Sequence, residues 1–219
     1  MRRPAPPPPP YSLREEIAHS VTPGLGIVAS IVGLTVLVAA AASRGTTRDV
    51  VGCAIFGTTL VLLYTASTLY HSIPLPNARP VLQVLDHSGI FLLIAGTYTP
   101  VALAKLPPAV GGTLLAVLWV AAIAGVVLTA ILRQRFRPVA HVLYLLMGWS
   151  AVAVADPLRA SLGPAGWWLI VAGGLAYTFG VGFYAMRRVR YHHLLWHLCV
   201  LAGSVLHYFA VLLYVIPRG

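Results

Sequence analysis

The chain has 219 residues, of which 58% are apolar and only 9% are charged. Soluble globular domains usually carry about 25% charged residues, so this chain has too few charges to cover a water-exposed surface. A net charge of +10 would indicate nucleic-acid binding in a soluble protein, but here the basic residues lie between apolar runs, where they act as topology signals. The composition therefore predicts a polytopic membrane protein with no nucleic-acid partner.

The chain begins with a proline-rich segment. Residues 1–14 read MRRPAPPPPPYSLR, which predicts a flexible, extended arm because consecutive prolines favour a solvated polyproline helix. The first apolar stretch begins near Val21 and is long for a cleaved signal sequence. Residues 15–219 are expected to form a single transmembrane domain.

Apolar runs of spanning length follow the arm. A helix needs about 20 residues to cross the hydrocarbon core of a bilayer. Pro100 should kink or end the third helix unless neighbouring groups satisfy the carbonyl that it frees. The expected fold is all-α, a bundle of seven transmembrane helices, with the fifth the shortest: Val21–Ala42, Val50–Tyr70, Leu82–Ala104, Ala109–Leu132, Val139–Ala155, Trp167–Met186 and Leu194–Ile216.

The basic residues are distributed unequally between the two sides of this bundle. Ten of the 15 Lys and Arg residues lie in the N-terminal arm and in the second, fourth and sixth loops, and the other five lie on the opposite side. Cytoplasmic loops carry the excess of positive charge in membrane proteins. The distribution predicts a cytoplasmic N-terminus and a C-terminus outside the cell.

Polar residues inside the predicted spans mark a candidate site, because ionisable groups are costly within a membrane. Of five carboxylates, Asp86 is the one expected to be embedded, at the start of the third span. His71 closes the second span. His193 and His197 open the seventh and are four residues apart, so they share one helix face. The predicted topology places all four residues near the cytoplasmic interface.

These residue types fit a catalytic metal site. His71, His193 and His197 would give zinc three neutral nitrogen ligands and leave a fourth position for water, which is typical of catalytic zinc. Zinc lowers the pKa of a bound water to about 7, and Asp86 could then orient or deprotonate that water. Ser67, four residues before His71, could hydrogen-bond a ligand or an oxyanion. A chance occurrence of the His-x-x-x-His spacing is the alternative interpretation.

The remaining histidines in or beside the spans are assigned no metal. A lone interfacial histidine usually hydrogen-bonds a neighbour or a lipid headgroup, which is the expectation for His87, His141 and His192. His207 lies well inside the seventh span and is expected to bond across helices.

Four segments of the chain resemble a known family: REEIAHSVTPGLG, STLYHS, LDHSGIFLLIAGTYTP and HHLLWHLCVLAGSVLHYFAV. From about Glu15 to Ile216 the chain is similar to the hemolysin III family, the bacterial branch of the progestin and adipoQ receptor superfamily. The resemblance implies a seven-helix protein of the bacterial plasma membrane with a cytoplasmic N-terminus. It also implies an intramembrane zinc held by the three histidines, with Asp86 near the zinc-bound water.

The first motif departs from the family pattern, which resembles E-x-x-N-x-x-T-H-G. Glu16 occupies the acidic position, but His19 replaces the asparagine and Pro23 replaces the histidine. The departure leaves the role of this motif open, while the three predicted zinc ligands are present.

Three classes of function remain. The first is a zinc-dependent hydrolase of a lipid amide or ester, which is favoured because the superfamily resembles alkaline ceramidases in its His and Asp constellation. The second is a pore-forming or cytolytic protein, as the family name implies, although the polar residues gather at one end and do not line a helix face. The third is a receptor or sensor with a structural zinc. A membrane lipid is the expected substrate or ligand, and the sequence does not indicate an oligomeric state.

Overall fold

A computed structural model describes residues 13–186 and 188–217, so most of the expected proline-rich arm lies outside the described part. In the described residues the secondary structure is entirely helical. Short 3-10 and π segments extend three of the helices: η1 (Arg133–Arg135), η2 (Trp149–Val154) and η3 (Val211–Val215). The α-helices are α1 (Leu13–Arg44), α2 (Thr47–Ser72), α3 (Arg79–Lys105), α4 (Pro108–Leu132), α5 (Arg137–Gly148), α6 (Ala155–Ala185) and α7 (His192–Ala210).

Six helical stretches of the described chain are long and apolar enough to cross a membrane. The expected fifth and sixth spans, apart from Met186, fall within one of them, a stretch of 49 residues from Arg137 to Ala185. They merge because α5 continues through η2 into α6 without a loop. A break nevertheless occurs at Gly163, where φ is +68°, a conformation that glycine adopts without strain.

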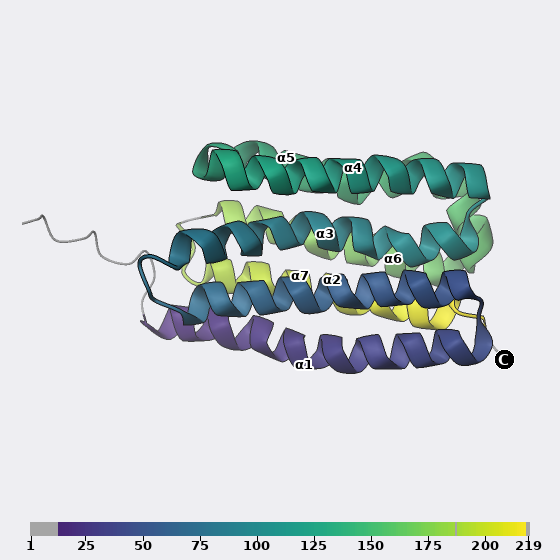
Figure 1. Cartoon of the computed structure of the whole chain (residues 1–219), viewed down its shortest axis with the longest axis horizontal. Coiled ribbons are helices and arrows are strands. Elements are labelled where there is room, and N and C mark those ends of the chain that lie inside the picture. The colour runs from purple at the N-terminus through teal and green to yellow at the C-terminus, as the bar shows by residue number, and fades with distance from the viewer. Residues whose placement is uncertain (1–12, 187, 218–219) are drawn as a thin grey trace, which may run out of the picture.

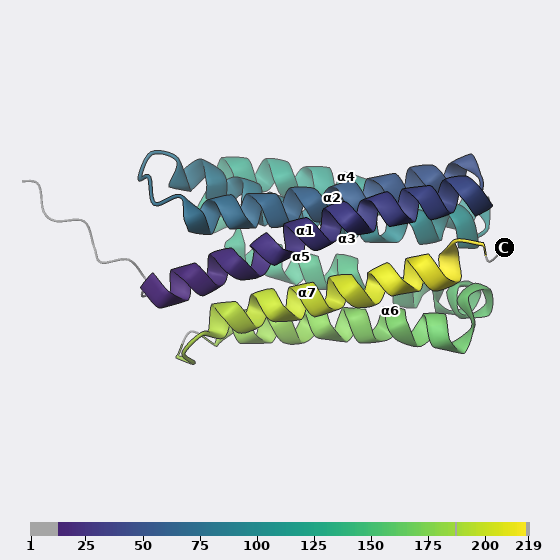
Figure 2. The same cartoon turned by 90° about the horizontal axis from the view of Figure 1, so that it is seen from below.

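The helices run along the long axis of the molecule (Figures 1 and 2). α4 and α5 lie on one side of the bundle and α1 lies on the opposite side (Figure 1). α1 begins at the end where α2 joins α3 and where α6 joins α7, and the chain finishes at the other end. The first and last helices therefore have their outer termini at opposite ends of the bundle.

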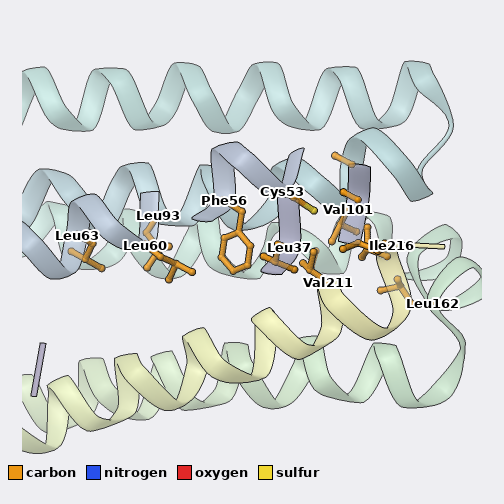
Figure 3. Packing of buried hydrophobic residues seen from close by; sticks show 14 of the residues in the cluster. Leu37, Cys53, Phe56, Leu60, Leu63, Leu93, Val101, Leu162, Val211 and Ile216 are labelled. Atoms are coloured by element: carbon orange, nitrogen blue, oxygen red, sulfur yellow. The ribbon is translucent and has the colours of Figure 1, made fainter. Parts of the chain in front are cut away.

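The core lies where α1, α2, α3 and the C-terminal part of the chain meet (Figure 3). Leu37 and Phe56 are fully buried, and Val211 is 1% exposed. Helices in lipid associate by close packing, since lipid tails are as apolar as the side chains. Gly52 shows how closely α2 and α3 approach, because a Cβ atom there would lie 2.6 Å from the Cα atom of Pro100. α3 continues past this buried proline to Lys105, so the helix does not end there.

The outer faces of α1 and α4 are apolar. Leu25 and Val28 of α1 are 64% exposed, and Val120 and Ile131 of α4 are 67% and 70% exposed. Large apolar surfaces of this kind mark contact with a membrane or another protein. Together with the six apolar stretches, they identify a multi-pass membrane protein whose outer helices face lipid.

Candidate metal centre

α7 supplies two histidines at the end of the bundle where α1 begins. His193 and His197 are one helical turn apart, are each 7% exposed, and have ring centroids 4.6 Å apart. The expectation that both rings share one helix face is confirmed. Their side chains point towards the last turn of α2, where His71 lies with its own ring centroid 5.0 Å from that of His193.

The Nε2 atoms of His71 and His193 lie 3.1 Å apart. Two nitrogen lone pairs facing each other at this distance repel, so a proton or a metal cation must lie between them. Two nitrogen ligands of a tetrahedral zinc, each about 2.05 Å from the metal, lie about 3.3 Å apart. The observed separation is therefore close to the spacing that a shared zinc imposes.

Glu16 of α1 holds His71 in the orientation that such a site needs. His71 donates from Nδ1 to Glu16 Oε2 at 3.1 Å, which leaves Nε2 with its lone pair directed at His193. Arg79 at the start of α3 donates to the other carboxylate oxygen at 2.8 Å. A carboxylate that accepts from the far nitrogen of a metal-binding histidine fixes its tautomer and raises its basicity.

His19 is a fourth histidine in the cluster, and the sequence analysis did not assign it to the metal. It lies one turn after Glu16 on α1 and is fully buried. Its ring centroid is 4.7 Å from that of His193 and 5.3 Å from that of His71. One ring nitrogen from each of these three histidines lies within 4.8 Å of the other two. The Glu-x-x-His spacing in the first motif was the signal that would have identified it.

Asp86 and Ser67 line the same cavity as three of the histidines. The cavity has a volume of about 60 Å³, and His71, His193 and His197 form part of its wall. Asp86 on α3 is half-buried, and Ser67 on α2 is 3% exposed. All five residues that the sequence analysis selected for the site are therefore brought together.

The donor set fits a metal ion with nitrogen ligands. The Nε2 atom of His197 and the Oγ atom of Ser67 are buried and have no hydrogen-bond partner among the described residues. Buried polar atoms of native proteins nearly always have a partner, so unpaired ones indicate an ion, a water or a ligand. Imidazole nitrogens suit zinc and other late first-row metals better than magnesium or calcium.

The histidines that were assigned no metal have other contacts. His87 pairs through Nδ1 with the Gln83 carbonyl, and His141 does so with the Arg137 carbonyl, each within its own helix. The expectation for His207 was wrong in part, because its Nδ1 donates to the Gly203 carbonyl of its own helix, although its ring stacks on Tyr177 of α6.

Comparison with known proteins identifies the family of the chain. Residues 11–208 match the family described as Haemolysin-III related. The chain is 41% identical over 204 residues to the Hemolysin-3 homolog of Bacillus subtilis (strain 168), covering 93% of this chain and 96% of the relative. It is 40% identical over 207 residues to Hemolysin-3 of Bacillus cereus, covering 94% of each chain. The chain therefore belongs to the haemolysin III family, as the sequence motifs predicted.

A more distant relative extends the comparison beyond bacteria. The Monocyte to macrophage differentiation factor of Homo sapiens is 26% identical over 164 residues, which cover 72% of this chain and 67% of that protein.

Proposed function

We propose that this protein is a membrane-embedded zinc hydrolase that cleaves an amide or ester bond of a lipid. One observation carries the proposal: a buried histidine cluster shares its cavity with a carboxylate and with a serine hydroxyl that has no hydrogen-bond partner in the described part of the chain. A metal-ligand set, a proton acceptor and a hydroxyl donor are the groups that metal-assisted hydrolysis requires.

In this proposal each side chain has a defined task. His71, His193 and His197 would hold the zinc, and Glu16 orients His71 through the hydrogen bond to its Nδ1 atom. Zinc, when bound, supplies a Lewis acid and makes water acidic enough to lose a proton near neutral pH. Asp86 would accept a proton from water in the cavity, and the Ser67 hydroxyl would donate a hydrogen bond to the substrate oxygen on which negative charge develops.

Seven crossings with a cytoplasmic N-terminus belong to the same proposal. A straight helix of 49 residues would be about 74 Å long, more than twice the thickness of the hydrocarbon core, so the stretch that contains Gly163 is long enough to cross twice. An odd number of crossings also agrees with the positions of α1 and η3 at opposite ends of the bundle. The proposal puts the histidine cluster at the cytoplasmic side of the bacterial plasma membrane, which is supported by the excess of positive charge at that end of the bundle.

The experiment measures zinc and lipid hydrolysis in the same preparations. Protein purified in mild detergent without a His-tag is expected to hold about one zinc per chain and to hydrolyse a labelled ceramide-like or ester-linked lipid. His71→Ala should lose both properties. His207→Gln is the matched control, because His207 is an equally buried histidine of α7 outside the cluster. Lipid hydrolysis at an unchanged rate in His71→Ala and His197→Ala would refute the proposal.

Cytolysis is the second candidate function, and the observation that favours it is the name Hemolysin-3 carried by the Bacillus cereus relative. Dye-loaded liposomes distinguish the two candidates. Leakage that increases with protein concentration, and that is the same in zinc-stripped and His71→Ala protein, would favour a pore. Zinc-loaded protein with neither leakage nor hydrolysis would favour a receptor or sensor.

A further inference from the structure

A second, larger cavity lies beside the histidine cavity. Its volume is about 430 Å³, and it is formed where the end of α2, the start of α3, η1 and the start of α5 meet. Tyr70, His87 and Arg137 line both cavities. The two cavities are therefore neighbours that share part of their walls, and the histidine cluster lies in the adjoining cavity.

The larger cavity is positively charged. Arg79, Arg133 and Arg137 line it, and none of the acidic residues in the described part of the chain does. Arg79 is paired with Glu16 at 2.8 Å. Among the described residues Arg133 and Arg137 have no carboxylate partner, so two guanidinium groups at this cavity are not neutralised.

The cavity also has apolar walls. Val84, Phe136 and Ala140 contribute to the lining, and Phe136 is 5% exposed. A water molecule takes about 30 Å³ of liquid volume, so the cavity is large enough for a phosphate group with part of its glycerol or polar substituent. Arginine binds phosphate oxygens through two parallel N–H groups, and basic pockets between transmembrane helices bind anionic headgroups.

We propose that this cavity binds the phosphate of an anionic phospholipid, and that such a phospholipid is the substrate of the neighbouring metal centre. The substrate role of the phospholipid rests on the proposed hydrolase activity. Hydrolysis would add water across the carbonyl–oxygen bond of an acyl ester, giving a fatty acid and a lysophospholipid with no other co-reactant. A neutral lipid such as ceramide offers no anionic group to the two guanidinium ions that lack a carboxylate partner among the described residues.

The test separates binding from turnover. Wild-type protein in neutral detergent is titrated calorimetrically with short-chain ether-linked phosphatidylglycerol, which cannot be hydrolysed at an ester. Ether-linked phosphatidylcholine and inorganic phosphate are the comparison ligands. Phosphatidylglycerol is expected to bind more tightly than either, and added salt should weaken its binding.

Arg133→Gln tests the cavity, because Arg133 is exposed, lines the cavity and has no task at the metal. Loss of one partly exposed charge pair should weaken binding about two- to fivefold. Arg188→Gln is the matched control, an exposed arginine of the α6–α7 connection at the same end of the bundle. Equal weakening in both variants, or equal affinity for the two phospholipids, would overturn the proposal. Inorganic phosphate that binds as tightly as the anionic lipid would also overturn it.

Failure of this inference is distinguishable from failure of the hydrolase. Selective binding of phosphatidylglycerol, with no hydrolysis of its ester-linked form, refutes the hydrolase and supports the headgroup site. Zinc-dependent hydrolysis of a ceramide-like lipid, with no preference for anionic lipid, supports the hydrolase and refutes the headgroup site.

Discussion

The contact between Glu16 and His71 makes the orientation of the metal ligands testable. In Glu16→Gln the side chain keeps its size but loses the negative charge that accepts from His71 Nδ1 and from Arg79. His71 then loses the partner that fixes its tautomer, and its Nε2 lone pair is no longer held towards His193. We expect Glu16→Gln to retain one zinc per chain and to bind it more weakly.

The size of the effect follows from two independent estimates. Replacing a group that supports a metal ligand typically weakens metal affinity by 10- to 100-fold, which is about 1.4–2.7 kcal/mol. A hydrogen bond to a charged group contributes about 1.5–3 kcal/mol. Only 17% of the Glu16 side chain is exposed, so solvent screening reduces the second value modestly. The two ranges overlap, and a decrease of at least tenfold in zinc affinity is therefore expected.

The assay is competition for zinc between the protein and a chromogenic chelator, in the same detergent for every variant. Glu15→Gln is the control, since it removes the same charge from the adjacent position of α1. Thermal unfolding at fixed free zinc gives a second readout, because a metal that binds only the folded state stabilises it in proportion to its affinity. A Glu16→Gln affinity within twofold of that of Glu15→Gln would refute the orienting role of Glu16.

Three further substitutions test the rest of the structure. Asp86→Asn should keep its zinc but lower the hydrolysis rate about 10²- to 10⁴-fold, because it removes the base and leaves the nitrogen ligands; complete loss of zinc, by elemental analysis, would make Asp86 a ligand instead. His19→Asn leaves the three proposed ligands in place, so the Co²⁺-substituted protein should keep its visible absorption spectrum, whereas a changed spectrum would place His19 in the coordination sphere. Gly52→Ala should destabilise the protein by about 1–3 kcal/mol in thermal unfolding, since the added Cβ would lie 2.6 Å from the backbone of Pro100, while Gly112→Ala, with open space around it, should not.

Hydropathy predicted the middle of each span better than its ends. The second, third and fourth helices begin and end within a few residues of the expected positions, because turn residues and prolines separate those apolar runs. α1 begins at Leu13 and not near Val21, because its first two turns are polar and hydropathy excludes them. In these turns Glu16 contacts His71 and Arg79, and the ring of His19 packs against other histidines. Such contacts between helices cannot be read from the hydropathy of a single segment.

The positions of the histidines relative to the predicted spans explain why three of them were predicted to form the site and His19 was not. His71, His193 and His197 were predicted to lie together because the order of the spans brings one end of the second helix to the start of the seventh. His19 precedes the predicted first span, so no spacing within a span connected it to the others. His19 stands where the family motif has an asparagine, so the sequence marked it as a departure from the motif and not as a ligand. In the structure its ring centroid lies within 5.3 Å of the ring centroids of His71 and His193.

The polar groups of the cluster couple the metal to the fold. α1, α2 and α7 each bury histidine nitrogens at this end of the bundle, where few water molecules can compete for them. A buried polar atom without a partner costs about 1–3 kcal/mol, and the His197 Nε2 and Ser67 Oγ atoms are two such atoms. The close approach of two Nε2 atoms adds repulsion unless a cation or proton lies between them. A bound metal removes the repulsion and satisfies the nitrogen atoms together, so the same ion that would activate water also joins three helices that are distant in the sequence.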